Sequence, residues 1–284
     1  MTCVLNQDQN REIAVQGVRS AVKNGARIVC LQELFSSQYF CQTEDVKCFD
    51  LAENIPGPST ELFSALAKEL SVVIVVPIFE KRTAGLYHNS AAVIDSTGVL
   101  VGVYRKLHIP DDPQYFEKFY FTPGELGYGV FDTTVARIGI LICWDQWYPE
   151  AARLTALEGA EIIFYPSAIG WLPTESQRDG LMQVDAWRTI QRSHAIANGV
   201  YVAAVNRVGQ EGNPGLSFWG QSFVCDPCGQ VIAEASENRS EVLVATCSRA
   251  ILEEQRRAWP FLRDRRIDTY GPITKRFLDN LSKS

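Results

Sequence analysis

Apolar runs of strand length alternate along this chain with stretches whose apolar residues have helical spacing. This alternation constrains the fold more than any other feature, because it predicts helices packed on the faces of one or more sheets. Residues 10–24 are expected to form the first helix, since apolar side chains share one helical face and a glycine follows. Residues 60–70, 149–158 and 185–197 have similar spacing and are also predicted to be helical.

Strands are predicted at the apolar runs between these helices. They are expected at 26–31, 72–79, 89–95, 99–104, 137–143, 160–166, 200–206, 221–226, 230–236 and 241–247. Several of these runs follow one another without an intervening helix, which favours a mixed sheet or two stacked sheets. No low-complexity linker divides the sequence, so residues 1–284 are predicted to form a single α/β domain, with about 250–284 as a tail used in packing or oligomerisation.

Composition argues against several classes of function. The formal net charge of −6 argues against a nucleic-acid partner, which would usually require a basic face. A chain of 284 residues, of which 46% are hydrophobic, can bury a core that is stable without disulfides or metal. We find no secretory signal and no apolar stretch of membrane length, and therefore expect no membrane partner and a cytoplasmic location.

The chain contains eight cysteines, most of them inside apolar runs, where they are expected to act as small buried hydrophobic residues. Cys225 and Cys228 have the spacing of a metal or redox pair, but no second pair accompanies them. The proline and glycine around them favour a turn between two strands. The sequence therefore predicts no metal site and no cofactor.

Three residues with the chemistry for nucleophilic catalysis each follow or end a predicted strand: Glu33, Lys106 and Cys143. In open α/β folds, sites lie outside the carboxyl ends of the strands, so these side chains can converge there. A carboxylate can accept the thiol proton, and an ammonium can stabilise a thiolate and a developing oxyanion. Position alone fits equally well with solvated charges at strand ends and an unreactive core cysteine.

The segments around these residues favour the catalytic interpretation. QELF around Glu33, GVYRKLHIP around Lys106 and ICWDQWYPEAARL around Cys143 occur in an order and spacing that resemble the nitrilase, or carbon–nitrogen hydrolase, superfamily. A fourth segment, QYFEKFYFTPG, is similar to the family's lid loop and contains Glu117. The resemblance covers nearly the whole chain and implies a four-layer α-β-β-α sandwich.

The same resemblance assigns roles to the residues at matching positions. Cys143 would be the nucleophile, Glu33 the general base, and Lys106 the cation that stabilises the oxyanion together with the backbone N–H of Trp144. Glu117 would position Lys106 or the substrate. The chain departs from the family pattern at its start, because it begins at the methionine that usually follows a strand of the form VxxVQM; we therefore expect an inner strand to be incomplete.

Within the superfamily, CWDQWYPEAAR, FYPSAIGW and YFEKFYFTPG most resemble the branch that hydrolyses N-carbamoylputrescine to putrescine, carbon dioxide and ammonia in polyamine biosynthesis. The implied partner is a small cationic carbamoyl amine, whose distal ammonium would seek carboxylates and aromatic faces. Packing behind the site or capping of a loop would explain several of the candidate residues equally well. The candidates for substrate binding are Tyr39, Asp111, Asp112, Trp144, Asp145, Trp147, Trp171 and Glu175.

Three other interpretations remain open. A Cys–His enzyme would use His88, His108 or His194, of which His108 lies close in sequence to Lys106. Another nitrilase-superfamily amidase or an N-carbamoyl amino acid hydrolase is the second; an amino acid substrate would want a basic partner for its carboxylate, and Arg178 or Arg207 could serve. A non-catalytic binding protein of the same fold is the third, but the presence of all four candidate catalytic residues favours an enzyme.

A segment near the end of the chain, from Arg256 to Tyr270, combines Trp259, Phe261 and Leu262 with five arginines. Exposed aromatic residues beside arginine are typical of protein interfaces. The segment could also pack as a strap on its own subunit. Since the resemblance implies dimers that often assemble further, we expect a homo-oligomer built from dimers.

Overall fold

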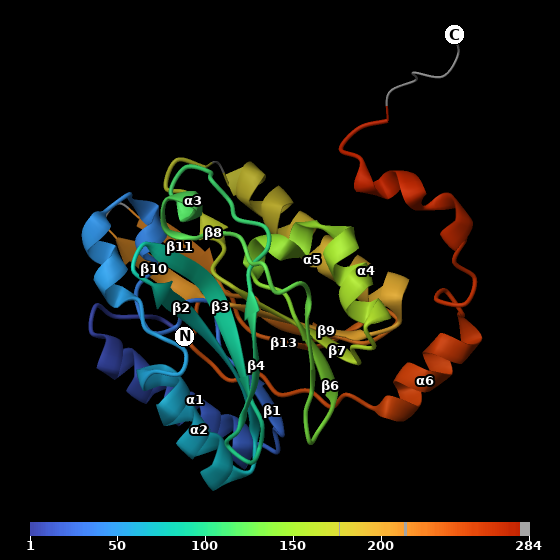
Figure 1. Cartoon of the computed structure of the whole chain (residues 1–284), viewed down its shortest axis with the longest axis horizontal. Coiled ribbons are helices and arrows are strands. Elements are labelled where there is room, and N and C mark those ends of the chain that lie inside the picture. Colours follow the sequence, from blue (N-terminus) through green and yellow to red (C-terminus); the bar gives the residue numbers. More distant parts are fainter. Residues whose placement is uncertain (176, 213–214, 279–284) are drawn as a thin grey trace.

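Two β-sheets lie face to face in this protein, and each is covered on its outer side by two helices (Figure 1). In this computed structural model, helices α1 (Gln7–Lys23) and α2 (Pro58–Leu70) cover the first sheet. Helices α4 (Pro149–Leu157) and α5 (Gln177–Asn198) cover the second sheet. The predicted four-layer α-β-β-α sandwich is confirmed.

The structure describes residues 1–175, 177–212 and 215–278. Two further helices are α3 (Glu117–Tyr120), in the loop between the sheets, and α6 (Arg249–Ala258), near the end of the chain. The strands are β1 (Ile28–Cys30), β2 (Val73–Thr83), β3 (Leu86–Ile94), β4 (Leu100–Arg105), β5 (Gly129–Asp132), β6 (Arg137–Ile140), β7 (Ile162–Ser167), β8 (Gly170–Trp171), β9 (Tyr201–Asn206), β10 (Val208–Gly212), β11 (Gly215–Trp219), β12 (Phe223–Cys225) and β13 (Val231–Glu234).

The first sheet has the strand order β1-β2-β3-β4, with β1 parallel to β2 and the other pairs antiparallel. Both faces of β2 are buried, because successive side chains point to opposite layers. Val73 and Val75 pack toward the second sheet, whereas Ile74 and Val76 pack under the covering helices. Burial on both faces explains why this strand is a continuous apolar run in the sequence.

The second sheet has the strand order β13-β12-β9-β7-β6-β5, and its central strands β6, β7 and β9 are parallel. Helices α4 and α5 connect these parallel strands in sequence, which places the ends of β6 and β7 at one edge of the sheet. Cys143 follows β6 at this edge. A small third sheet with the order β10-β11-β8 lies at the same end of the molecule as α3 (Figure 1).

All four helices predicted from apolar spacing are found, and only α5 is much longer than expected. The segment 241–247 has no strand pairing, so the prediction of a strand there is wrong. A cavity of about 1010 Å³ is lined by both this segment and β1, which forms an edge of the first sheet. Because a strand needs a paired neighbour, apolar composition alone does not produce one here. Met1 also lines the cavity, which is the kind of gap expected beside an incomplete inner strand.

Cys225 and Cys228 lie at the turn between β12 and β13, as predicted. The side chain of Asp226 closes this turn, because its Oδ1 atom accepts hydrogen bonds at 2.9 Å from the backbone N–H groups of Cys228 and Gln230. All eight cysteines of the chain are free thiols. The CxxC spacing here therefore reflects a turn between strands.

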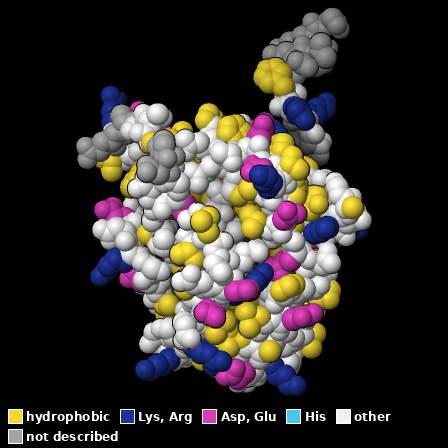
Figure 2. Space-filling model, turned by 90° about the vertical axis from the view of Figure 1, so that its left-hand side faces the viewer, with side chains coloured by type: hydrophobic (Ala, Val, Ile, Leu, Met, Phe, Trp, Pro, Cys, Tyr) yellow, Lys and Arg dark blue, Asp and Glu magenta, His cyan; other side chains and the backbone are white. Residues whose placement is uncertain are grey.

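The surface carries charges of both signs. Figure 2 shows one face, on which acidic and basic side chains are interspersed without a continuous basic patch. Among the helices that the structure describes, none combines the length and the apolar character needed to cross a bilayer.

Candidate active site

Glu33 lies on the turn that follows β1, and its side chain is completely buried. Its Oε1 atom accepts hydrogen bonds from Lys106 Nζ at 2.9 Å and from Asn89 Nδ2 at 2.7 Å. Its Oε2 atom is buried and has no hydrogen-bond partner among the described residues. One oxygen of the carboxylate is therefore fixed, and the other is available to accept a proton.

Lys106 directly follows β4 and is also completely buried. Its Nζ atom lies 2.9 Å from Glu33 Oε1 and 2.6 Å from Glu117 Oε2. Burial lowers the pKa of this ammonium, but the charges of Glu117 and Glu33 outweigh burial and raise the pKa well above its ordinary value. The side chain is therefore a permanent cation between two carboxylates.

Cys143 begins a short 3₁₀ turn (Cys143–Trp147) just after β6, which ends at Ile140. Its backbone φ is 43°, a left-handed value that a non-glycine residue adopts at a cost of about 1 kcal/mol or more. The predicted strand was thus too long at this end. This conformation separates Cys143 from an ordinary core cysteine within a strand.

The thiol of Cys143 lies within electrostatic reach of the buried charges. Burial is the largest cause of a thiol pKa well above the ordinary value, the charge of Glu33 raises it further, and the charge of Lys106 opposes the shift. The structure thus brings the three strand-end residues together as predicted. Because the resting thiol is neutral, a nearby base must remove its proton before it can attack.

Glu117, the first residue of α3, is the second buried carboxylate beside the cation. Its Oε1 atom accepts a hydrogen bond from the Tyr39 hydroxyl at 2.7 Å, while its Oε2 atom faces Lys106. Burial raises the pKa of Glu117 to about 7, with Lys106 opposing the shift and Glu33 adding to it. Since the Tyr39 hydroxyl is used in this way, the structure places Tyr39 as a support for Glu117 rather than as a free substrate contact.

Replacing Glu117 by glutamine is expected to change the pH dependence of folding. The folded-state pKa of about 7 exceeds the ordinary value of 4.5, so this carboxyl stabilises the fold fully below pH 4.5, and the contribution is lost as the pH rises toward 7. Between these pH values, wild-type protein should lose up to about 3 kcal/mol of unfolding free energy relative to Glu117→Gln. Denaturant unfolding across this range measures the difference, with Glu61→Gln on the exposed face of α2 as control. Equal pH slopes for wild type and Glu117→Gln contradict the prediction.

Asp145, a predicted substrate contact, is completely buried and uses both carboxylate oxygens within the protein. It accepts hydrogen bonds from the backbone N–H of Ile142, from the hydroxyl of Tyr104, and from both the backbone N–H and the ring Nδ1 of His108. The structure therefore gives no support for a substrate contact by Asp145. Instead this residue closes the turn that carries Cys143, because it bonds across the start of that turn.

Three tryptophans were proposed as aromatic walls. Trp144 and Trp147 are partly exposed, and their rings meet edge to face with centroids 6.4 Å apart. Trp171 lies on β8 against the buried Trp219, with ring centroids 5.7 Å apart. The indole N–H groups of Trp147 and Trp171 are buried without a partner among the described residues, so both retain an unused hydrogen-bond donor.

The structure separates the remaining carboxylates into two groups. Asp111 and Asp112 are exposed on the loop before α3, where the backbone of Asp112 pairs with that of Tyr115. Glu175 is half-buried, and its carboxylate accepts hydrogen bonds from the Leu172 backbone N–H and the Gln183 side chain. Burial raises the pKa of the Tyr115 hydroxyl, and the charges of Cys143, Glu175 and Glu33 raise it further. Tyr115 thus links Glu175 to the thiol, whereas Asp111 and Asp112 have no such link in the described contacts.

The histidines of the Cys–His alternative have other partners. His108 Nδ1 lies 2.7 Å from Asp145 Oδ1, and its ring stacks on Tyr148 at 3.7 Å. His194 Nε2 lies 2.8 Å from the backbone oxygen of Gln146, and His88 Nδ1 lies 2.8 Å from that of Thr122. Their geometry gives no support for a Cys–His pair in the described part of the chain.

Asn89 is a site residue that the sequence analysis missed. It is completely buried on β3, donates to Glu33, and its backbone oxygen accepts a hydrogen bond from the Lys106 backbone N–H at 2.8 Å. The signal was present in the sequence, since an asparagine within an apolar strand must find hydrogen-bond partners. Which partners it finds depends on the pairing of β3 with β4.

Comparison with known proteins gives consistent results. The carbon–nitrogen hydrolase family model matches residues 2–257. An N-carbamoylputrescine amidase from Solanum lycopersicum is 45% identical over 275 residues, which cover 94% of this chain and 90% of that protein. A citrullinase from Francisella tularensis is 42% identical over 275 residues, which cover 96% of this chain and 95% of that protein. The crystal structure of a carbon–nitrogen hydrolase from Helicobacter pylori G27 has 48% sequence identity and a TM-score of 0.94, with coverage of 98% of this chain and 97% of that one.

The fold and these similarities define an amidohydrolase, an enzyme that cleaves carbon–nitrogen bonds. The chain belongs to the carbon–nitrogen hydrolase family, as its motifs predicted.

Proposed function

We propose that this enzyme hydrolyses N-carbamoylputrescine to putrescine, carbon dioxide and ammonia, and that it serves polyamine biosynthesis. The amidase from Solanum lycopersicum supports this choice of substrate. The observation that carries the chemistry is the unpartnered Oε2 atom of the buried Glu33 beside a neutral thiol and a fixed cation. This combination provides a base, a nucleophile and a positive charge in one desolvated site.

In the proposed mechanism, Glu33 accepts the proton of the Cys143 thiol through its free oxygen. The thiolate attacks the carbamoyl carbon and forms a bond to it, while the carbonyl electron pair moves to the oxygen. Collapse of this adduct breaks a carbon–nitrogen bond, and the protonated Glu33 returns the proton to the leaving nitrogen. A water molecule, deprotonated by Glu33, then attacks the covalent intermediate and releases the thiol.

The developing oxyanion requires positive charge in the same site. The Lys106 ammonium is held by Glu33 and Glu117, so it is oriented before the reaction begins. We propose that it binds the oxyanion together with the backbone N–H of Trp144, the residue after the nucleophile. Glu117, supported by Tyr39, fixes the ammonium in position.

Recognition of the distal ammonium requires a carboxylate at some distance from the thiol. Of the carboxylates proposed from the sequence, Asp145 is fully used within the protein, whereas Asp111 and Asp112 lie exposed before α3. Glu175 is half-buried and lies within electrostatic reach of Tyr115, which is itself within reach of Cys143. We propose Glu175 as the residue that binds the distal ammonium.

Ammonia release from a panel of substrates tests this function. N-carbamoylputrescine should give the highest kcat/KM, ahead of citrulline, N-carbamoyl-β-alanine and a neutral N-carbamoyl alkylamine. Citrulline is a necessary comparison because of the similarity to a citrullinase. Its carboxylate cannot pair with Arg207, which is completely buried in protein contacts. Preference for citrulline or for the carbamoyl amino acid contradicts the proposed substrate.

The same panel includes the variant Glu175→Gln. Loss of one charge-assisted hydrogen bond should raise KM for N-carbamoylputrescine by about 10-fold or more and leave the neutral carbamoyl alkylamine unaffected. Glu125→Gln is the matched control, because that carboxylate is also paired with side chains but lies on the other side of Lys106 in sequence. Equal effects of Glu175→Gln on both substrates rule out its role as the ammonium contact.

We also propose that a second copy of the chain covers the exposed end of the molecule. The segment after α6 stands clear of the body in both views (Figures 1 and 2), and Trp259 and Phe261 are 56% and 43% exposed. Arg256 anchors the start of this segment through bonds to the backbone oxygens of Gly199 and Ala160. Unpaired aromatic residues beside arginines support an interface between subunits. The cytoplasmic location remains a prediction.

A further inference from the structure

The turn that carries Glu33 contains backbone strain. Leu34, the next residue, has a left-handed φ of 50° and is buried. A non-glycine residue in this conformation costs about 1 kcal/mol or more and persists only where surrounding contacts hold it. The direction of the Glu33 side chain depends on this turn, so the groups that hold the turn also set the position of the base.

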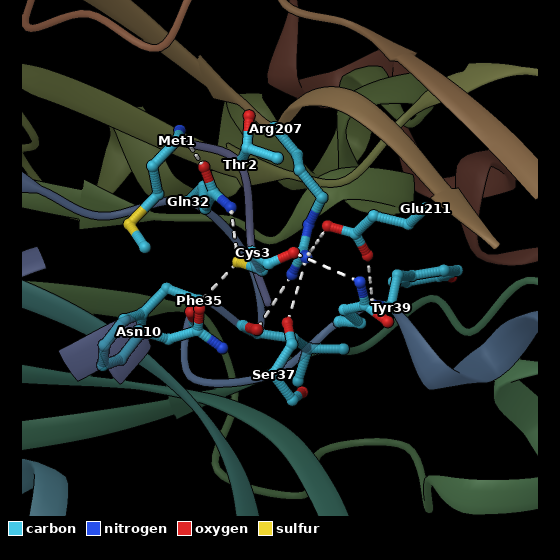
Figure 3. A network of polar contacts seen from close by, with 12 residues as sticks. Met1, Thr2, Cys3, Asn10, Gln32, Phe35, Ser37, Tyr39, Arg207 and Glu211 are labelled. Atoms are coloured by element: carbon cyan, nitrogen blue, oxygen red, sulfur yellow. Dashed lines mark hydrogen bonds and ion pairs between the residues drawn. The ribbon is translucent and has the colours of Figure 1, made fainter. Parts of the chain in front are cut away.

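Arg207 supplies those contacts from the other sheet. Its guanidinium donates to the backbone oxygens of Glu33 at 2.9 Å, Leu34 at 2.9 Å and Ser37 at 3.0 Å. Figure 3 shows this fan of bonds converging on one side chain. Arg207 lies between β9 and β10 and is completely buried, with its guanidinium over the ring of Phe218 at 5.4 Å. One side chain therefore connects the second sheet to the turn of the base.

Glu211 extends the same network toward the second carboxylate. Its Oε1 atom accepts from Arg207 at 2.7 Å, and its Oε2 atom accepts from the backbone N–H of Tyr39 at 2.6 Å (Figure 3). The hydroxyl of Tyr39 in turn donates to Glu117. The buried ion pair thus contacts the backbone of Glu33 directly and reaches Glu117 through one tyrosine.

Stability alone does not account for this arrangement. A buried ion pair is often no more stabilising than apolar residues of similar volume, because desolvation offsets the attraction between the charges. Here the guanidinium makes three bonds to one strained turn, and only one nitrogen faces the carboxylate. Such bonds restrict geometry, which matters for catalysis because small displacements of a base lower its rate steeply.

We propose that Arg207 and Glu211 are positioning residues that hold Glu33 and Glu117 in their reactive geometry. This inference rests on the proposed roles of Glu33, Glu117 and Cys143. It assigns to Arg207 a function different from binding a substrate carboxylate. Neither residue touches the substrate, so their loss should lower kcat and leave KM nearly constant.

The test compares Arg207→Lys with wild type. Lysine keeps the positive charge but cannot bond three carbonyls at once with a planar fork. We expect kcat for N-carbamoylputrescine to fall about 10- to 100-fold with KM changed less than about threefold. The rate of Cys143 alkylation by iodoacetamide at neutral pH should fall in parallel, and the acid limb of the kcat profile should move. Unchanged kcat and alkylation, with only a lower melting temperature, overturn the proposal.

Arg188→Lys is the matched control. Arg188 also pairs with a carboxylate, Glu234, and lies over an aromatic ring, Phe223 at 5.5 Å, but the described contacts do not join it to the turn of Glu33. It should leave kcat and alkylation unchanged; a loss equal to that of Arg207→Lys overturns the proposal. If Arg207→Lys does not fold, Glu211→Gln replaces it, with an expected fall in kcat of about 10-fold at constant KM; unchanged kcat in that variant overturns the proposal.

The two readouts separate this inference from the proposed function. Alkylation of Cys143 needs no substrate, so it reports the geometry of the base even if N-carbamoylputrescine is not turned over. Failure of the substrate panel with a normal difference in alkylation rejects the substrate and retains the positioning role. Normal turnover by both wild type and Arg207→Lys rejects the positioning role and retains the substrate.

Discussion

Replacing Cys143 by alanine is expected to lower kcat at least about 10⁴-fold while the protein stays folded. The change removes the only atom that can form the covalent intermediate, and Glu33 and Lys106 alone cannot substitute for it. The fold should persist because alanine removes a single buried atom and leaves the charges of the cluster in place. Ammonia release measures the activity, and circular dichroism with thermal melting measures the fold.

The matched control is Cys225→Ala. Cys225 is also buried, and burial raises its pKa to about 12, but it lies on β12 without a buried carboxylate or lysine as hydrogen-bond partner in the described contacts. Its loss should leave kcat within about twofold of wild type. Iodoacetamide should inactivate the wild-type enzyme with one equivalent bound at Cys143. Retention of more than about 1% of kcat by Cys143→Ala would refute its assignment as the nucleophile.

Replacing Lys106 by methionine should remove both activity and a large part of the stability. The variant leaves two buried carboxylates, Glu33 and Glu117, without the cation that lies 2.9 and 2.6 Å from them. Removing one partner from a buried ion pair costs about 3–5 kcal/mol, and loss of the oxyanion contact should lower kcat about 10³-fold. Denaturant unfolding and ammonia release measure the two effects.

The pH dependence of this destabilisation has a definite sign. Without the cation, the pKa values of the two carboxyl groups rise in the folded state, so their protonated forms favour folding and the loss of stability grows as the pH rises. Lys106→Met should therefore be closest to wild type in stability near pH 4.5 and furthest from it above pH 7. Adding Glu117→Gln to Lys106→Met should recover stability but not activity, because one buried charge is removed while the oxyanion contact is still missing. The control Lys68→Met, on the exposed face of α2, should change neither; a destabilisation independent of pH contradicts the prediction.

The fold was predictable where local pattern and tertiary environment agree. The apolar spacing at 149–158 predicts α4 because one face of that helix packs on the second sheet, and the continuous apolar run at 72–79 predicts a strand buried on both faces. The segment 241–247 shows the limit of this reasoning. Its residues favour a strand, but a cavity separates it from the edge of β1, and pairing depends on a neighbour that the local sequence does not specify.

The candidate site was predictable as a set of residues but not as a geometry. Glu33, Lys106, Cys143 and Glu117 were identified from motifs, and the structure brings them together. Asp145 could not be assigned correctly, because its sequence position beside Cys143 suits both a substrate contact and a group that closes the turn. Asn89, Arg207 and Glu211 were missed as parts of the site, since they act through hydrogen bonds to residues distant in the chain.

The sequence by itself determined the layered α/β class, the family and the chemical groups available for hydrolysis. These depend on residue type and local spacing, which are properties of neighbouring positions. Only the tertiary structure decided which oxygen of Glu33 stays free, how two carboxylates share Lys106, and which side chain holds the strained turn at Leu34. Those features require contacts between β1, β3, β4 and β9 within a few ångströms, and such distances exist only after the two sheets have packed together.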